Sequence, residues 1–220
     1  MKLSDFLWET LFPRKCILCG KVLKDQELDL CRRCREETPE VTSERELLSP
    51  LADWTAVWYY DDHVRESILR YKFGGTACYA DAYGRILGMR ILRDFPEKFD
   101  LLTWVPVSQK RRRKRGYDQG ELLAQAVGRE IGMEPVRLLC KVRDNPAQSG
   151  ISDPDERQAN VSGVYRSICP ELVSGKRILL LDDVITTGAT AGECARMLLE
   201  SGAEEVYCAA VAAARSHTKT

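Results

Sequence analysis

The sequence has no net charge, no long apolar run and only two histidines. Its 33 Lys and Arg residues balance its 33 Asp and Glu residues, so a nucleic acid would have to be bound by a local basic patch and not by a field over the whole protein. No apolar run approaches the roughly 18 residues that a membrane span needs, and the amino terminus has no signal-peptide core. We therefore expect a cytoplasmic protein without membrane insertion.

Two common nucleotide-binding motifs are also missing. The chain contains neither G-x-x-x-x-G-K-[ST] nor G-x-G-x-x-G. The histidines, His63 and His217, are isolated in the sequence, and we expect them to face solvent and not to catalyse. Any phosphate site must therefore be built from another motif.

Cysteine is plentiful, but its placement argues against disulfides. Four of the nine cysteines form two C-x-x-C knuckles, Cys16/Cys19 and Cys31/Cys34, separated by eleven residues. Four thiolates at this spacing favour a closed, tetrahedral structural Zn²⁺ site, and such a short segment should fold only with its metal. Redox pairs are the alternative, but neither knuckle lies in a βαβ pattern. The other five cysteines are expected to be small core residues: Cys78, Cys140, Cys169, Cys194 and Cys208.

The chain divides near residue 40. We expect a zinc-binding domain with a leading helix over residues 1–37, a polar linker over 38–50 and a larger domain over 51–220. In the larger domain, periodicity predicts strands at 54–60, 101–107, 136–142, 164–167, 178–181 and 205–211, and helices at 62–71, 78–94, 121–131 and 191–199. The strand at 101–107 should begin the main sheet. This order favours an α/β fold with a parallel sheet and a small accessory layer.

The strand at 178–181 and the loop after it form the most informative stretch. An unbroken apolar run is typical of a strand buried on both faces, and Asp182 and Asp183 follow where the strand should end. The next residues are small or hydroxylated and open a helix: Thr186, Thr187, Gly188, Ala189 and Thr190. Such a loop suits a phosphate, whereas the acids need hydroxyl groups or a metal ion. The simpler alternative is an N-capped helix beside two solvated acids.

A run of six basic residues, Lys110 to Arg115, follows Ser108 and Gln109. Like charges in a row usually indicate a solvated or nucleic-acid-facing loop. This run, however, should lie at the same edge of the sheet as the acid pair, where a pyrophosphate would need added positive charge. Contact with pyrophosphate, contact with nucleic acid and an inert surface all remain open.

These motifs resemble those of the ComF family. The stretch Leu179–Thr190 is similar to the phosphoribosyl-pyrophosphate (PRPP) motif of type I phosphoribosyltransferases. The four-cysteine element, the sequence Arg115–Gln119 and a polar segment at 143–160 occur in the order of the family. The resemblance implies a type I phosphoribosyltransferase fold after a zinc-ribbon-like element, and a link to uptake of transforming DNA. Structureless segments of this length inside a domain are often functional, and we expect 143–160 to be a lid.

The resemblance also implies roles for individual residues. Asp182 and Asp183 would be the catalytic pair that holds the ribose hydroxyls, and residues 186–190 would bind the 5-phosphate. Pyrophosphate, with Mg²⁺, would be bound by Ser108, Gln109, Lys110, Arg111 and Arg115. The lid would contribute Gln148, Ser149 and Arg157, and Lys72 would be a further contact. Relatives also hold a cis peptide in the pyrophosphate loop, so we expect one within residues 107–110.

The residue at position 186 leaves open which molecule would accept the phosphoribosyl group. In purine-salvage relatives the position of Thr186 is an aspartate that handles the proton of the base, and that general base is missing here. Two classes of function follow. One is a PRPP-dependent transferase with an unknown nitrogen acceptor. The other is a scaffold or sensor that binds single-stranded DNA or proteins of the DNA-uptake machinery.

Overall fold

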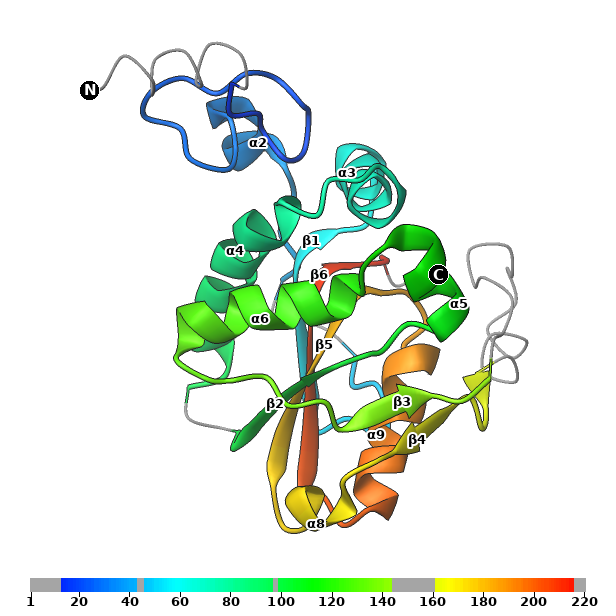
Figure 1. Cartoon of the computed structure of the whole chain (residues 1–220). Helices are drawn as coiled ribbons and strands as arrows, with labels where there is room; N and C mark the ends of the chain where they lie inside the picture. Colours follow the sequence, from blue (N-terminus) through cyan, green and yellow to red (C-terminus); the bar gives the residue numbers. More distant parts are fainter. Residues whose placement is uncertain (1–12, 43–45, 97–98, 144–160, 216–220) are drawn as a thin grey trace.

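A four-stranded parallel sheet forms the centre of the protein in the computed structural model, which describes residues 13–42, 46–96, 99–143 and 161–215 (Figure 1). The strand order is β1-β6-β5-β2. The strands are β1 (Asp53–Tyr59), β2 (Leu101–Trp104), β5 (Arg177–Ile185) and β6 (Glu205–Ala213), and all neighbours are parallel. The predicted α/β fold is confirmed. The sheet begins with β1 and not with β2, because β1 pairs with β6 at the far edge.

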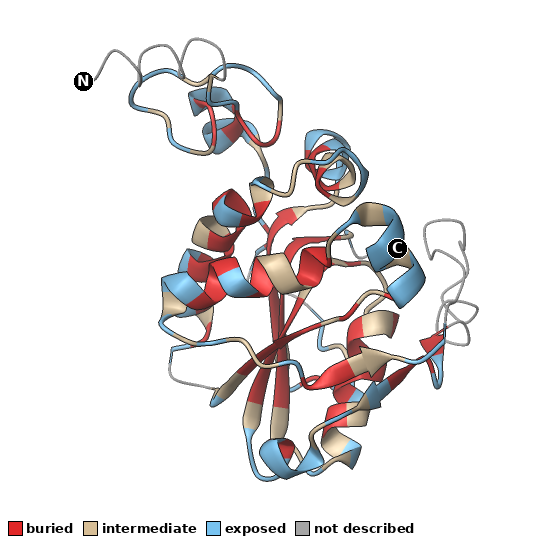
Figure 2. Ribbon diagram, viewed as in Figure 1, coloured by how far each residue is buried: buried red, intermediate tan, exposed pale blue. Residues whose placement is uncertain are grey.

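Helices cover both faces of this sheet. On one face α4 (Tyr79–Asp94) packs against α6 (Gln119–Ile131), and on the other lies α9 (Ala189–Glu200) (Figure 1). A Cβ on Gly84 would lie 2.4 Å from that of Ala126, so only glycine permits the close approach of α4 and α6. The buried residues form two apolar clusters, and Figure 2 shows the strands of the central sheet as largely buried.

Smaller elements surround this core. They are α2 (Arg32–Glu37), α3 (Asp62–Phe73), α5 (Gln109–Arg115), α8 (Pro170–Val173), β3 (Leu139–Lys141) and β4 (Tyr165–Ser167). Strands β3 and β4 pair antiparallel in a separate sheet, which is the expected accessory layer. The predicted leading helix, His217 and the lid residues Gln148, Ser149 and Arg157 lie outside the described residues. Within the described part, no helix is long and apolar enough to cross a membrane.

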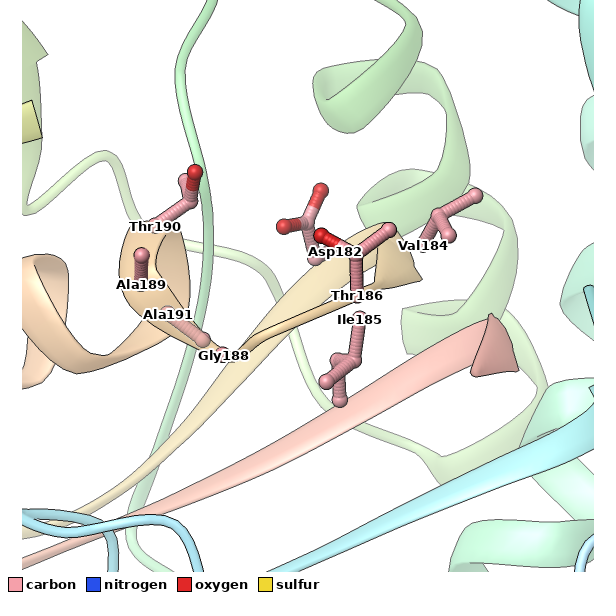
Figure 3. Close-up of a pocket in the computed structure, with 8 residues that line it drawn as sticks. All are labelled: Asp182, Val184, Ile185, Thr186, Gly188, Ala189, Thr190 and Ala191. Carbon is pink, nitrogen blue, oxygen red and sulfur yellow. The ribbon is translucent and has the colours of Figure 1, made fainter. Parts of the chain in front are cut away.

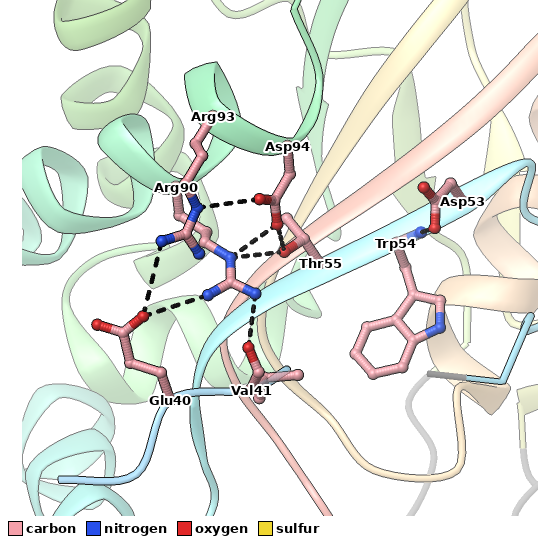
Figure 4. Close-up of polar contacts among 8 residues, drawn as sticks. All are labelled: Glu40, Val41, Asp53, Trp54, Thr55, Arg90, Arg93 and Asp94. Atoms are coloured by element: carbon pink, nitrogen blue, oxygen red, sulfur yellow. Dashed lines mark hydrogen bonds and ion pairs between the residues drawn. The ribbon is translucent and has the colours of Figure 1, made fainter. Parts of the chain in front are cut away.

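The segment expected to be a linker is fastened to the sheet. The N–H of Val41 donates to the carbonyl of Val57 at 2.9 Å. The buried guanidinium of Arg90 donates to the carbonyl of Val41 at 2.7 Å, to Thr55 Oγ1 at 3.0 Å and to Asp94 Oδ2 at 2.7 Å (Figure 4). A buried arginine is stable only when its donors find acceptors in this way. The polar composition of 38–50 therefore does not mean that its described residues are detached.

Candidate functional site

The two aspartates lie within β5 and not after it. Asp182 pairs with Ala210, and the pairing of β5 with β6 continues to Ile185. The pairing of β5 with β2 stops at Leu181. The expectation that the strand ends before the acids was wrong, because β6 extends the ladder on one side. The acids begin where β2 ends, at the carboxyl edge of the sheet, where ligands of α/β proteins bind.

Asp183 is the centre of a group of polar side chains from three separate elements. Lys72 Nζ of α3 lies 2.7 Å from Asp183 Oδ1, and both side chains are largely buried. Gln119 Nε2 of α6 lies 3.4 Å from Asp183 Oδ2, and Gln119 Oε1 accepts a hydrogen bond from Arg115. Lys72 thus supplies the counter-charge that a buried carboxylate requires.

The neighbouring aspartate is partly protonated near neutral pH. Burial, followed by the negative charge of Asp183, raises the pKa of Asp182 to about 7. The charge of Lys72 and the N–H of Asp183, which donates to Asp182 Oδ1 at 2.8 Å, act in the opposite direction. A ligand that brings positive charge or hydroxyl donors to this pair would release the proton.

The small-residue loop after β5 opens a pocket. Gly188 has φ 77° and caps α9 without a side-chain hydrogen bond. The lining residues of this pocket are Asp182, Val184, Ile185, Thr186, Gly188, Ala189, Thr190 and Ala191. Figure 3 shows the side chains of Asp182 and Thr190 on the same side of the loop, whereas Ile185 points the opposite way. Small residues at the start of a helix leave room for only one part of a ligand, and the backbone N–H groups there suit a phosphate.

The floor of this loop comes from the segment expected to be a linker. A Cβ on Gly188 would lie 2.9 Å from Leu48 Cδ1, so Leu48 packs directly against the glycine. The N–H of Ala189 donates to Thr187 Oγ1 at 3.4 Å. Backbone geometry and apolar contact with Leu48 therefore help to hold the loop.

The basic run is a helix and not a loop. Ser108 caps α5, with its Oγ accepting from the N–H of Arg111 at 3.3 Å, and Gly116 ends it with φ 83°. Arg111 and Arg115, one turn apart, are only partly exposed. The other side chains of the run and Gln109 are exposed: Lys110, Arg112, Arg113 and Lys114. The helix therefore separates the charges into an inner pair and an outer face. This division could not be predicted as long as the run was expected to be a loop.

The turn between β2 and α6 is held by Asp118. Its Oδ1 accepts from the N–H groups of Gly120 at 2.9 Å and Glu121 at 3.2 Å, and its Oδ2 accepts from Val107 at 3.2 Å. Burial raises the pKa of Asp118 and these N–H groups lower it. The predicted cis peptide within residues 107–110 was wrong, because among the described residues the only cis bond is Ser49–Pro50. The turn is instead fixed by the two caps, Asp118 and Ser108.

Sequence reasoning missed two members of the site. Gln119 was noted only as part of a motif, and its position directly after a helix-capping aspartate was the available signal. Tyr71 gave no signal at all. Its hydroxyl donates to the carbonyl of Gln119 at 2.6 Å, and burial raises its pKa, so it remains a donor. Tyr71 therefore connects α3 to the start of α6, next to Lys72.

The four knuckle cysteines meet at one point. The sulfurs of Cys16, Cys19, Cys31 and Cys34 all lie within 4.8 Å of one another, and Cys19 Sγ lies 3.7 Å from Cys31 Sγ. Zn–S bonds of about 2.3 Å in a tetrahedron place sulfurs about 3.8 Å apart, so the cluster fits structural zinc. The carboxylates of Asp182 and Asp183 offer oxygen donors of the type that Mg²⁺ prefers, and they are the residues that could hold such an ion. Among the other cysteines, Cys194 and Cys208 are buried as expected, whereas Cys78 is exposed.

Comparison with known proteins gives a domain-family match for each of the two parts of the chain. Residues 118–220 match the phosphoribosyl transferase domain, and residues 7–45 match the double zinc ribbon domain. The first match includes the acid pair and the loop after β5, whereas Lys72 and α5 precede it. A solved structure, glutamine PRPP amidotransferase from Bacillus subtilis, is 22% identical with a TM-score of 0.43, covering 64% of this chain and 30% of its own.

Curated relatives match over most of their length. DNA utilization protein YhgH of Escherichia coli (strain K12) is 27% identical over 203 residues, covering 88% of this chain and 82% of that protein. Competence protein ComFC of Bacillus subtilis (strain 168) is 30% identical over 214 residues, covering 90% of this chain and 85% of that protein. The chain therefore belongs to the ComF family, with a phosphoribosyltransferase domain and an amino-terminal double zinc ribbon.

Proposed function

We propose that the protein binds PRPP with Mg²⁺ at the carboxyl edge of the sheet and transfers the phosphoribosyl group to a nitrogen acceptor. The observation that carries this proposal is the acid pair Asp182–Asp183, neutralised by Lys72 at 2.7 Å and placed beside the pocket at the start of α9. One side of the site suits hydroxyl groups and the other suits a phosphate. PRPP offers both groups at the two sides of one ribose.

The proposed mechanism assigns a separate task to each side of the site. The loop at 186–190 would hold the 5-phosphate through backbone N–H groups and hydroxyls. Asp182 and Asp183 would bind the ribose hydroxyls and favour the positive charge that develops on the ring as the bond to pyrophosphate breaks. Mg²⁺, when bound with the substrate, would neutralise charge on the pyrophosphate. Arg111 and Arg115, on the inner face of α5, would receive the leaving pyrophosphate.

The acceptor nitrogen must react without a protein carboxylate at position 186 to take its proton. Position 186 is Thr, so no carboxylate at that position takes a proton from a purine. An acceptor whose nitrogen is nucleophilic without deprotonation, or which loses its proton to solvent, fits this site better than a purine base. This argument defines a chemical class and not a compound.

Calorimetric titration with PRPP and Mg²⁺ tests the proposal. The parent protein should bind with measurable heat, and Asp182→Asn with Asp183→Asn should abolish it. A matched control is Asp81→Asn, because Asp81 is an exposed acid that pairs with Arg129 and does not line the pocket. Absence of heat from the parent protein would remove the proposal. Equal binding by the double variant would show that the acids are not the site.

The outer face of α5 supports a second candidate, binding of single-stranded DNA. Lys110, Arg112, Arg113 and Lys114 are exposed on one short helix. Next to this helix, Phe73 is 66% exposed, and the guanidinium of Arg115 lies 4.6 Å from the centre of its ring. Basic side chains beside an exposed aromatic ring are the features of a surface on which unpaired bases stack.

Salt dependence of binding tests this candidate. Replacing the four exposed basic residues with Ser should flatten the plot of log affinity against log salt by about 0.7 for each phosphate that the variant no longer neutralises. Arg129→Ala, which removes an exposed charge on α6, should leave the slope unchanged. An unaltered slope in the fourfold variant would exclude α5 from any DNA interface.

A further inference from the structure

Helix α3 contacts the zinc ribbon and the proposed PRPP site through consecutive residues. Ser67 and Arg70 bind the ribbon, and Tyr71 and Lys72 bind the site. We propose that Arg70 is a positioning residue that makes the ribbon part of the support for Lys72, so that metal occupancy of the ribbon and PRPP affinity are linked. This inference rests on the proposed PRPP site and adds a route by which that site is regulated.

On the ribbon side, Arg70 binds the peptide groups between two metal ligands. Its Nη2 donates to the carbonyl of Ile17 at 3.0 Å and to that of Leu18 at 2.6 Å. The hydroxyl of Ser67 also bonds the carbonyl of Ile17. Ile17 and Leu18 lie between Cys16 and Cys19 in the first knuckle, and both are buried. The two carbonyls keep this arrangement as long as one ion holds both thiolates.

On the other side, the same helix turn reaches the acid pair. Tyr71 donates to the carbonyl of Gln119, and its own carbonyl accepts from the hydroxyl of Tyr117. Lys72 then pairs with Asp183. A shift of α3 that followed loss of the ribbon would move Lys72 and Tyr71 together, because their backbones are adjacent in one helix.

Arg70 is poorly satisfied apart from the ribbon carbonyls. Within the described residues, its Nε is buried without a hydrogen-bond partner, and Glu66 lies at 4.0 Å from Nη1. A partly buried guanidinium with few acceptors is unfavourable. The two knuckle carbonyls are therefore its main acceptors, and loss of the folded knuckle would leave it without them.

A second arginine provides a matched control. Arg85 of α4 also fastens the ribbon, donating to Asp29 from Nε at 2.9 Å and from Nη2 at 2.6 Å. Arg85 lies on a different helix from Lys72. Removing either arginine weakens the attachment of the ribbon, but only Arg70 should affect the link to the acid pair.

The experiment measures the equilibrium affinity of the intact protein for zinc by competition with a zinc-selective chromogenic chelator, with and without PRPP and Mg²⁺. Couplings between sites typically change an equilibrium affinity about 5- to 150-fold, and they act equally in both directions. We expect PRPP to raise the zinc affinity at least about fivefold in the parent and in Arg85→Ala. In Arg70→Ala, PRPP should not change the zinc affinity, and Arg70→Lys, which can donate to both carbonyls, should recover part of the effect.

Each outcome has a distinct meaning. Zinc content of Arg70→Ala, measured before the competition, checks that its ribbon is loaded. PRPP that binds the parent by calorimetry but leaves its zinc affinity unchanged would overturn the linkage alone. Linkage of equal size in Arg70→Ala and the parent would overturn the role of Arg70. Failure of the parent to bind PRPP would remove the proposed function and the linkage with it.

Discussion

The zinc ribbon and the acid-pair site assemble their functional groups over different distances in the chain. All four ribbon ligands lie between Cys16 and Cys34, and one ion would hold them. In the acid-pair site, Asp183 meets Gln119 from 64 residues away, and Gln119 meets Tyr71 from 48 residues away. The ribbon depends on local spacing and a metal, whereas the site depends on the packing of three helices against one sheet.

Removing zinc should give the largest difference between these two regions. Structural zinc contributes on the order of 10 kcal/mol to small domains, and the ribbon is too short to bury a core of its own. Cys31→Ser should therefore unfold residues 13–38, while β5 and β6 keep the apolar cluster that they form with α9, which contains none of those residues. Hydrogen exchange resolves the two regions, and Cys78→Ser, at an exposed cysteine, is the control. Retained protection of the ribbon in Cys31→Ser would contradict the metal assignment.

The next effect concerns the ion pair of the site. Lys72→Met leaves Asp183 buried without its cation, which typically costs about 3–5 kcal/mol of folding free energy. Asp183→Asn in the same chain should recover much of that loss, since no charge then remains unpaired. Denaturant unfolding of the two single variants and the double variant measures the pair. A loss in Lys72→Met below about 1 kcal/mol would show that the pair is solvated and the site more open than described.

The same contrast explains what could be predicted from the sequence. The cysteine spacing identified the cluster, and the apolar run before Asp182 identified a buried strand, because both signals are local. The secondary structure of the run Lys110–Arg115 could not be predicted, because charge repulsion favoured a loop while the caps Ser108 and Gly116 allow a helix. The contacts of Lys72, Gln119 and Tyr71 depend on tertiary packing, and only the family resemblance suggested the first of them.

A glycine substitution tests the loop after β5 at a smaller scale. Gly188→Ala places a side chain at φ 77°, which costs of order 1–3 kcal/mol, and brings its Cβ against Leu48. Gly163→Ala is a matched control, because Gly163 has φ 65° with nothing within 4 Å of its Cβ position. The difference between the two losses of stability isolates the clash with Leu48.

PRPP affinity sharpens this test. If residues 186–190 hold the 5-phosphate, Gly188→Ala should weaken binding, whereas Gly163→Ala should not. Equal losses of stability in the two variants, with unchanged PRPP affinity, would show that Leu48 yields easily and that the loop tolerates the change.

Protonation of the acid-pair site gives a further test, in which stability and PRPP affinity should respond to pH in opposite directions. Because the pKa of Asp182 is raised to about 7, the folded protein holds a proton that the unfolded chain, with an ordinary pKa of 3.8, releases. The free energy of unfolding should therefore fall as pH rises from about 4 to 7. Asp182→Asn should lack this part of the pH dependence, as measured by denaturant unfolding at several pH values.

Binding of PRPP should change with pH in the opposite sense. If the ligand needs the ionised form of Asp182, the competent fraction rises by about tenfold between pH 6 and pH 8 for a pKa near 7. Calorimetry at the two pH values measures this change in affinity. An affinity that is flat with pH in the parent would mean that the aspartate binds the sugar in its protonated form, as a hydrogen-bond donor, and Asp182→Asn would then retain PRPP binding.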